Sequence, residues 1–217
     1  GGAATDACAT ADASGSTASK PLIDGSKIDA RQTTTLHGTV PLKVAKSQDL
    51  GAMGQTESIP SMTLVLKRSA AQQKMFDAFL ASLNNPASPN FHKWLTAKQV
   101  GEAYGPNADD VATVTKWLNS QGLGVKNVSP DRMRIRFTGS VGAVQRAFGT
   151  SMRRYNAEGK THFANATEQK LPAALTPVVA GVASLTDFFP KPLVKNVQAV
   201  KRDGKGHWVS AGNRSPR

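Results

Sequence analysis

The chain has 217 residues, a formal net charge of +12 at pH 7, 39% hydrophobic residues and 6% aromatic residues. This length allows one sizeable domain with tails or two small domains, and the low aromatic content indicates that part of the chain is unstructured. The single cysteine, Cys8, excludes an internal disulfide framework and any cysteine-based metal site. No apolar run approaches the ~18 residues of a membrane span, so none is predicted.

The positive charge is unevenly distributed. Residues 1–59 carry five basic and six acidic side chains, residues 60–190 carry fifteen and eight, and residues 191–217 carry seven and one. The middle is therefore a basic domain of net +7, and the end is a basic tail of net +6. Such a balance favours an acidic partner, which can be nucleic acid, anionic lipid or an acidic protein.

Residues 1–20 consist almost entirely of Gly, Ala, Ser, Thr and Asp, a composition that buries too little apolar surface to offset chain entropy. Residues 21–59 contain scattered apolar residues without a long period. We therefore predict a leader over residues 1–59 that is disordered to weakly structured. A folded domain is predicted over residues 60–190, and a basic linker over residues 191–217.

The folded domain is predicted to begin with a strand over residues 61–66, where apolar and polar side chains alternate. Helices are predicted to follow over residues 69–83, 96–104 and 107–122. Each begins at a residue type that caps helix N-termini: Ser69, Thr96 and Asn107. A strand over residues 123–128 then turns back into an arginine-rich strand.

The arginine-rich strand carries two kinds of side chain in alternation: Met133, Ile135 and Phe137 with Arg132, Arg134 and Arg136. Successive side chains of a strand point to opposite faces, so one face is predicted to be apolar and the other cationic. Ser140 is the predicted N-cap of a short helix, and Gly149 suits its left-handed end. A hairpin over residues 152–164 and an apolar strand over residues 178–185, central or covered on both sides, complete the domain.

This order contains a split β-α-β arrangement. We predict an α+β fold in which helices lie on one face of an antiparallel sheet, as in ferredoxin-like domains.

Gly149-Thr150-Ser151 has the letters of a nucleophile motif, but a helix end followed by a strand explains it better, because no histidine lies nearby in sequence. The histidines lie in separate loops or termini without ligand spacing: His37, His92, His162 and His207. Asp109 and Asp110 are explained by a helix N-terminus. We therefore assign no catalytic residue and no metal ligand, and predict that this chain alone is not an enzyme.

Nucleic-acid binding is the alternative that the basic charge raises. The arginines of the predicted sheet are not interleaved with aromatic residues, as a base-stacking platform requires. The aromatic side chains mostly fall on apolar faces, where core packing is the default: Trp94, Tyr104, Trp117 and Tyr155. A nucleic-acid partner is therefore not predicted.

Several motifs occur in a fixed order over residues 60–190: Ser88-Pro89-Asn90-Phe91-His92-Lys93-Trp94-Leu95-Thr96, Tyr104-Gly105-Pro106, Ala147-Phe148-Gly149-Thr150, Phe163-Ala164-Asn165 and Val179-Ala180-Gly181-Val182. Their order and spacing resemble the activation domain of sedolisin peptidases, the kumamolisin-type serine-carboxyl peptidases. The resemblance implies a propeptide similar in fold to subtilisin propeptides. Such a propeptide acts as intramolecular chaperone and inhibitor of its peptidase domain and is removed by autoproteolysis at low pH.

The same resemblance implies a secreted protein whose signal peptide is absent from this chain. The family's Ser-Glu-Asp triad and calcium site belong to the peptidase domain, so we expect no cofactor here. The implied partner is the chain's own sedolisin-type peptidase domain, in cis or after cleavage. A stand-alone peptidase inhibitor with the same fold is the other alternative.

A docking face for an acidic peptidase domain is predicted to comprise Arg132, Arg134, Arg136 and Arg154. The processing bond is expected in the linker, near His207-Trp208 or just after Arg217.

Overall fold

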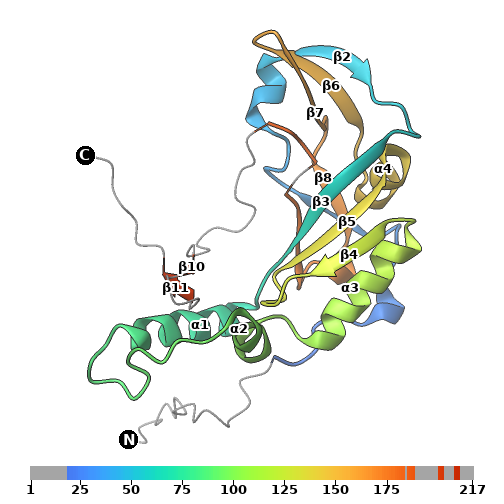
Figure 1. The fold of residues 1–217 in the computed structure, drawn as a ribbon. Helices are drawn as coiled ribbons and strands as arrows, with labels where there is room; N and C mark the ends of the chain where they lie inside the picture. Colours follow the sequence, from blue (N-terminus) through green and yellow to red (C-terminus); the bar gives the residue numbers. More distant parts are fainter. Residues whose placement is uncertain (1–18, 184, 189–199, 203–207, 211–217) are drawn as a thin grey trace, which may run out of the picture.

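A computed structural model describes residues 19–183, 185–188, 200–202 and 208–210 of the chain (Figure 1). Its central element is a four-stranded antiparallel sheet with the strand order β4-β5-β3-β9. The strands of this sheet are β3 (Ser58–Leu66), β4 (Gly124–Val128), β5 (Arg134–Ser140) and β9 (Val179–Val182). The α-helices of the described residues are α1 (Ala70–Leu83), α2 (Ala97–Tyr104), α3 (Ala108–Ser120) and α4 (Val141–Phe148).

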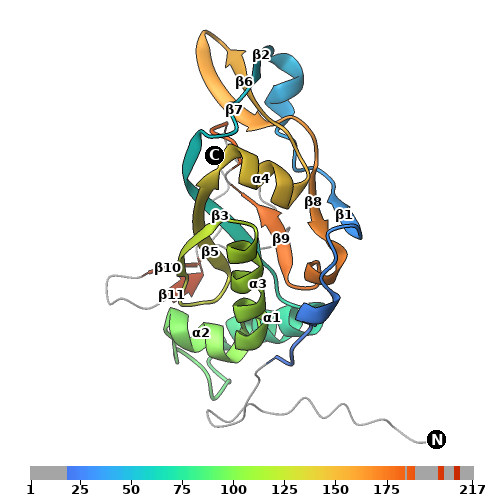
Figure 2. The same ribbon diagram turned by 90° about the vertical axis from the view of Figure 1, so that its right-hand side faces the viewer.

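The strand order interleaves two split β-α-β units. β3 leads through α1, α2 and α3 to β4, and β5 lies between these two strands in the sheet. β5 leads through α4 and then residues 149–178, which form smaller elements, to β9, and β3 lies between β5 and β9. Figure 2 shows α3 and α4 on the same face of the sheet, whereas α1 and α2 lie at one end of it. This arrangement confirms the predicted α+β, ferredoxin-like fold with helices on one face.

Phe148, the last residue of α4, lies between two aromatic rings of the core. Its ring centroid is 6.0 Å from that of Phe137 on β5 and 5.8 Å from that of Trp117 on α3. Phe137 and Phe148 are fully buried. Because these rings come from the sheet and from both covering helices, they join the two layers of the fold. The inward side chains of β3 are also fully buried: Met62, Leu64 and Leu66.

The helices begin at the predicted capping residues. In each case the side chain accepts a hydrogen bond from a backbone N–H of the first turn, a bond that the helix itself cannot supply. Gly149, at the end of α4, has a φ of 55°, a left-handed conformation that costs glycine little. The confirmed caps are Ser69, Thr96, Asn107 and Ser140.

Smaller sheets complete the described fold. β6 (Met152–Ala157) and β7 (Lys160–Asn165) form the predicted hairpin, and β2 (Gln48–Ala52) pairs with the outer edge of β6. β1 (Thr33–Leu36) pairs with β8 (Gln169–Pro172). The linker contributes a pair formed by β10 (Val200–Arg202) and β11 (Trp208–Ser210). The 3-10 helices are η1 (Gly25–Lys27), η2 (Leu42–Lys46) and η3 (Ala173–Leu175).

Residues 19–57, from the predicted leader, contact the folded domain at several points. The backbone N–H groups of Leu22 and Ile23 donate to the Asp110 carboxylate on α3, at 2.8 and 3.1 Å. Ile23 packs into the core, and β1 and β2 pair with strands from the second half of the chain. The described part of the leader is thus more structured than its weak periodicity indicates, because its partners lie far away in sequence.

Two strands differ from their predicted form. β5 begins at Arg134 rather than Arg132, because Ser129 to Arg132 form a turn in which Asp131 Oδ1 accepts from Ser129 Oγ at 2.6 Å and from Met133 N at 3.1 Å. β9 has four residues and lies at the edge of the sheet, so it is not the central strand that its apolar sequence indicates. It is nevertheless mostly buried.

Candidate docking surface

The face of the four-stranded sheet opposite α3 and α4 carries none of the described helices (Figures 1 and 2). On β5, exposed Arg134 and Arg136 alternate with Ile135 and Phe137, which are fully buried under the helices. The alternation predicted for this part of the strand is therefore confirmed. The two guanidinium groups consequently leave the sheet on its open side.

The surroundings of these arginines are short of negative charge. Arg136 lies opposite Thr63 on β3 and opposite Asn127 on β4, and its Nη2 donates to Ser61 Oγ at 3.3 Å. Arg134 lies opposite Val65. None of the salt bridges formed within the described residues involves either arginine. Guanidinium groups in this state can offer paired N–H donors to carboxylates of another molecule.

Arg132 does not belong to this face, which corrects its predicted position. It lies in the turn before β5 with a φ of 60°, and its Nη1 is 3.5 Å from the carbonyl oxygen of Pro106, between α2 and α3. Its side chain therefore reaches towards the helices. The prediction was wrong because Arg132 belongs to the turn, whereas a strand that began at Arg132 would have placed its side chain on the open face.

Arg154 lies on β6, in a different sheet, and its guanidinium is already paired. Its Nη2 is 2.5 Å from Glu57 Oε1, while the other carboxylate oxygen of Glu57 accepts from the N–H of Gly54 at 2.7 Å. The pKa of Glu57 is lowered by the hydrogen bond from Arg154 and then by that from Gly54. Arg153 is paired in the same way with Asp49, at 2.8 Å. The cationic face that the structure assembles is therefore Arg134 and Arg136.

An additional basic residue that was not predicted for this region is Lys126. It is exposed on β4, the strand next to β5, at an irregularity in the pairing between Val125 and Asn127. The alternation in the sequence gives no signal for it, because a bulge interrupts the two-residue period.

The predicted processing region is described only in part. His207 and Arg217 lie outside the described residues. Trp208 is the first residue of β11, where its backbone pairs with Arg202 of β10.

The described residues bring no catalytic group together around Ser151. Gly149 ends α4, and Ser151 is an exposed residue before β6 whose carbonyl oxygen accepts from Ala166 N at 2.8 Å. His162 is 3.2 Å from the Asp187 carboxylate and forms no hydrogen bond with Ser151. No group of three or more His, Cys, Asp or Glu side chains in this part of the chain is arranged to hold a metal ion. None of its helices is long and apolar enough to cross a membrane.

Comparison with known protein families places this fold. The family described as Pro-kumamolisin, activation domain, matches residues 45–188, which is more than half of the chain. The chain belongs to this family. The family comprises activation domains of sedolisin-type peptidase precursors, and this membership supports a propeptide role for the chain.

Individual relatives of this activation domain are peptidases. Xanthomonalisin from Xanthomonas sp. is 34% identical over 119 residues, which are 55% of this chain and 14% of that protein. Sedolisin from Pseudomonas sp. is 31% identical over 134 residues, which are 62% of this chain and 22% of that protein. Tripeptidyl-peptidase sed4 from Aspergillus fumigatus is 29% identical over 133 residues, 60% of this chain and 21% of the protein. The chain thus spans less than a quarter of these relatives.

The family match also divides the described structure. Residues 19–44, with η1, β1 and the start of η2, precede the matched part of the activation domain. The match ends at Phe188, shortly after the last residue of β9. Asp187 holds that end in place, because its Oδ1 accepts from Phe163 N at 2.9 Å and its N–H donates to Phe163 O at 3.2 Å.

Proposed function

We propose that this activation domain inhibits its own sedolisin-type peptidase domain, assists its folding, and is removed from it by autoproteolysis at low pH in a secreted precursor. The family membership supports a propeptide role, and the open sheet face carries the proposal of how it docks. A sheet covered by helices on one side has its second side available for a partner. Here that side presents Arg134 and Arg136, which form no ion pair within the described residues.

In the proposed complex, electrostatic attraction first brings the two domains together, and the arginines are then removed from water at the contact. The basic domain attracts an acidic peptidase surface, which accelerates encounter, and bound arginines then donate to its carboxylates. As the pH falls, carboxylates with an unperturbed pKa of about 4 become protonated while arginine remains charged. Attraction is therefore lost from the partner's side alone, which provides a physical route to release in acid.

The linker contributes by tethering. A segment joined to the peptidase domain is present at a high effective concentration, so a weak substrate-like contact in the cleft becomes strong inhibition in cis. The bond that is processed lies in residues 191–217 in this proposal. N-terminal sequencing of the matured enzyme identifies it.

The docking face is tested by inhibition of a mature sedolisin-type peptidase with the purified chain near neutral pH. We expect Arg134→Glu to raise the inhibition constant at least tenfold, about 1.4 kcal/mol, because a carboxylate replaces the donor at a desolvated contact. Lys116→Glu is the matched control: it makes the same charge change on the exposed side of α3, across the domain from the open sheet face. Equal inhibition by Arg134→Glu and the unmodified chain contradicts the proposed face.

Two observations separate the proposal from its alternatives. The codons that follow Arg217 encode a peptidase domain if the chain is a propeptide, and none if it is a stand-alone inhibitor. Salt-dependent retention on DNA, together with no effect on any sedolisin-type peptidase, would support nucleic-acid binding instead.

A further inference from the structure

The loop that follows β1 encloses a carboxylate of the folded domain. The backbone N–H groups of Gly38, Thr39 and Val40 donate to Glu168, at 3.0, 2.7 and 3.0 Å. The hydroxyl oxygen of Thr39 is also 2.8 Å from Glu168 Oε2. Successive backbone N–H groups that converge on one oxygen pair form a concave anion site, which here is filled by a side chain from 128 to 130 residues away.

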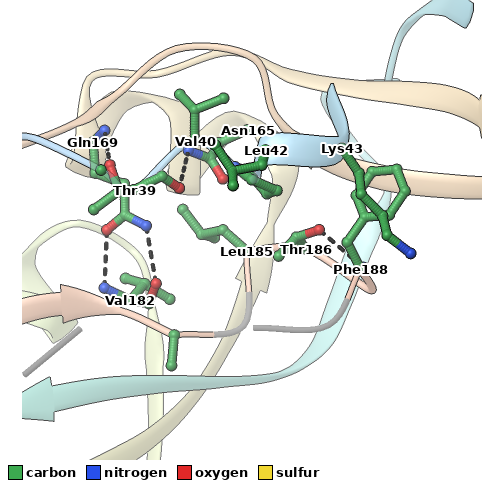
Figure 3. Close-up of a pocket in the computed structure, with 13 residues that line it drawn as sticks. Thr39, Val40, Leu42, Lys43, Asn165, Gln169, Val182, Leu185, Thr186 and Phe188 are labelled. Atoms are coloured by element: carbon green, nitrogen blue, oxygen red, sulfur yellow. Dashed lines mark hydrogen bonds between the residues drawn. The ribbon is translucent and has the colours of Figure 1, made fainter. Parts of the chain in front are cut away.

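The same loop covers the segment through which the domain continues into the linker. Residues 38–43 line a cavity of about 270 Å³ together with residues of the covered segment, which are Val182, Ala183, Leu185, Thr186 and Phe188. Figure 3 shows Val40 and Leu42 from the loop, and Leu185 and Phe188 from the covered segment, among the side chains around it. Phe188 is buried, whereas Leu42 is 69% exposed. A loop that lies over a cavity makes few apolar contacts, so its polar contacts largely determine whether it stays in place.

Neutral groups also contact Thr39 of this loop, whose hydroxyl oxygen lies 2.7 Å from the carbonyl oxygen of Leu36. The side-chain Nδ2 of Asn165 donates to the Thr39 carbonyl at 3.1 Å, and Gln169 N donates to Thr39 Oγ1 at 2.9 Å. A hydrogen bond to an ionised acceptor is worth about twice a neutral one, so the carboxylate of Glu168 supplies the largest share of the polar stabilisation.

Charged and titratable groups on the surrounding elements are His37 before the loop, Lys43 in η2, Lys170 in β8 and Asp187 in the covered segment. No ion pair within the described chain joins any of them to Glu168. Burial raises the pKa of Glu168, but the hydrogen bonds from Thr39, Gly38 and Val40 outweigh it, and the pKa lies below its ordinary value. A carboxylate with a lowered pKa stabilises the closed loop above its unfolded pKa, and this stabilisation is lost as the pH falls through the folded pKa.

We propose that residues 37–43 form an acid-released flap, which protonation of Glu168 frees from the domain so that residues 182–183 and 185–188 become exposed. The strands of the central sheet do not share this sensitivity, because they pair through backbone groups and pack through apolar side chains, neither of which titrates. The flap therefore opens while the sheet remains folded. In the proposed function this opening coincides with acid processing and loosens the attachment of the linker, but the motion itself depends only on this chain.

Hydrogen exchange of the purified full chain tests the flap without any peptidase, so its outcome is independent of the proposed function. Protection factors are compared between pH 7 and pH 3, after correction for intrinsic exchange. We expect the amides of residues 38–40 to lose protection at least tenfold below pH about 4, where carboxylates titrate. The amides of residues 135–137 in β5 should retain theirs and report that the sheet is intact.

Glu168→Gln should show the tenfold loss already at pH 7, with no further change on acidification. Glu158→Gln is the matched control, since Glu158 is an exposed residue of the β6–β7 turn, and it should behave like the unmodified chain. His37→Gln should leave the transition in place, which separates Glu168 from its titratable neighbour. The proposal is overturned if residues 38–40 stay protected to pH 3, lose protection together with β5, or are unaffected at pH 7 by Glu168→Gln.

Discussion

Gln169 closes the outer edge of β9 with its side chain. Its Nε2 donates to the carbonyl oxygen of Val182 at 2.9 Å, and its Oε1 accepts from the N–H of Val182 at 2.9 Å (Figure 3). The amide thus replaces the peptide group of a further strand. Both residues are almost completely buried, at 1% and 2% exposure, so water does not reach these groups. The replacement Gln169→Leu keeps the side-chain size and removes both hydrogen bonds.

The free-energy cost of Gln169→Leu follows from the backbone groups of Val182 that lose their hydrogen-bond partners. Two buried backbone groups lose their partners, at about 1–3 kcal/mol each. A leucine in the same place gains about 1.5–3 kcal/mol from apolar burial, which offsets part of this loss. We expect a net decrease of about 2 kcal/mol in the free energy of unfolding. For a domain of this size that corresponds to a decrease in Tm of about 4–8 °C.

Urea denaturation followed by tryptophan fluorescence measures this change, because Trp117 lies in the core. Gln32→Leu is the control: Gln32 is exposed, and it forms hydrogen bonds through its backbone, whose carbonyl oxygen accepts from Ala173 N at 2.8 Å and whose N–H donates to Asp29 O at 3.1 Å. We expect the control to remain within about 0.5 kcal/mol of the unmodified chain. A decrease below about 0.5 kcal/mol for Gln169→Leu, at an unchanged m value, refutes the edge-closing role.

Three further substitutions are measured by the same denaturation assay. Phe148→Ala should cost about 3–5 kcal/mol, because it leaves a cavity beside Trp117 in the centre of the core; a loss under 2 kcal/mol would show that the layers collapse onto the site. Gly101→Ala should destabilise by more than the helix propensity of alanine gains, about 1 kcal/mol, since the added Cβ would lie 2.5 Å from the carbonyl oxygen of Pro130; a stabilised variant contradicts this close approach. Ser140→Ala should cost about 1 kcal/mol through loss of the N-cap of α4, and Ser140→Asp should restore most of it.

The sequence predicts best what is decided within a few residues. The caps at Ser69 and Ser140 and the left-handed Gly149 depend on local hydrogen bonds and backbone freedom, and all are found. The alternation at Arg134 and Arg136 follows from the strand period and is also found, so two of the four arginines predicted for the docking face lie on the open side of the sheet.

What the sequence does not predict depends on distant partners. Arg154 is neutralised by Glu57, 97 residues away, so its exposure cannot be judged from its own strand. β1 has the sequence Thr-Thr-Thr-Leu, without apolar alternation, and is a strand only because residues 169–172 pair with it. β9 has the apolar composition of a central strand because Gln169, β3 and the core bury it, although it has a neighbouring strand on one side only.

The position of β3 between β5 and β9 has a consequence for the order of events during synthesis. Leu64 of β3 pairs with Ile135 of β5 and with Val182 of β9. β3 is therefore synthesised before either of the strands that pair with it. Contacts that span so much of the chain make folding slow relative to a helical domain of equal size. A nascent chain that ends before β9 has an unpaired edge along β3, and such edges promote association with other chains. The domain therefore gains its native sheet in a late step, once residues 179–182 have left the ribosome.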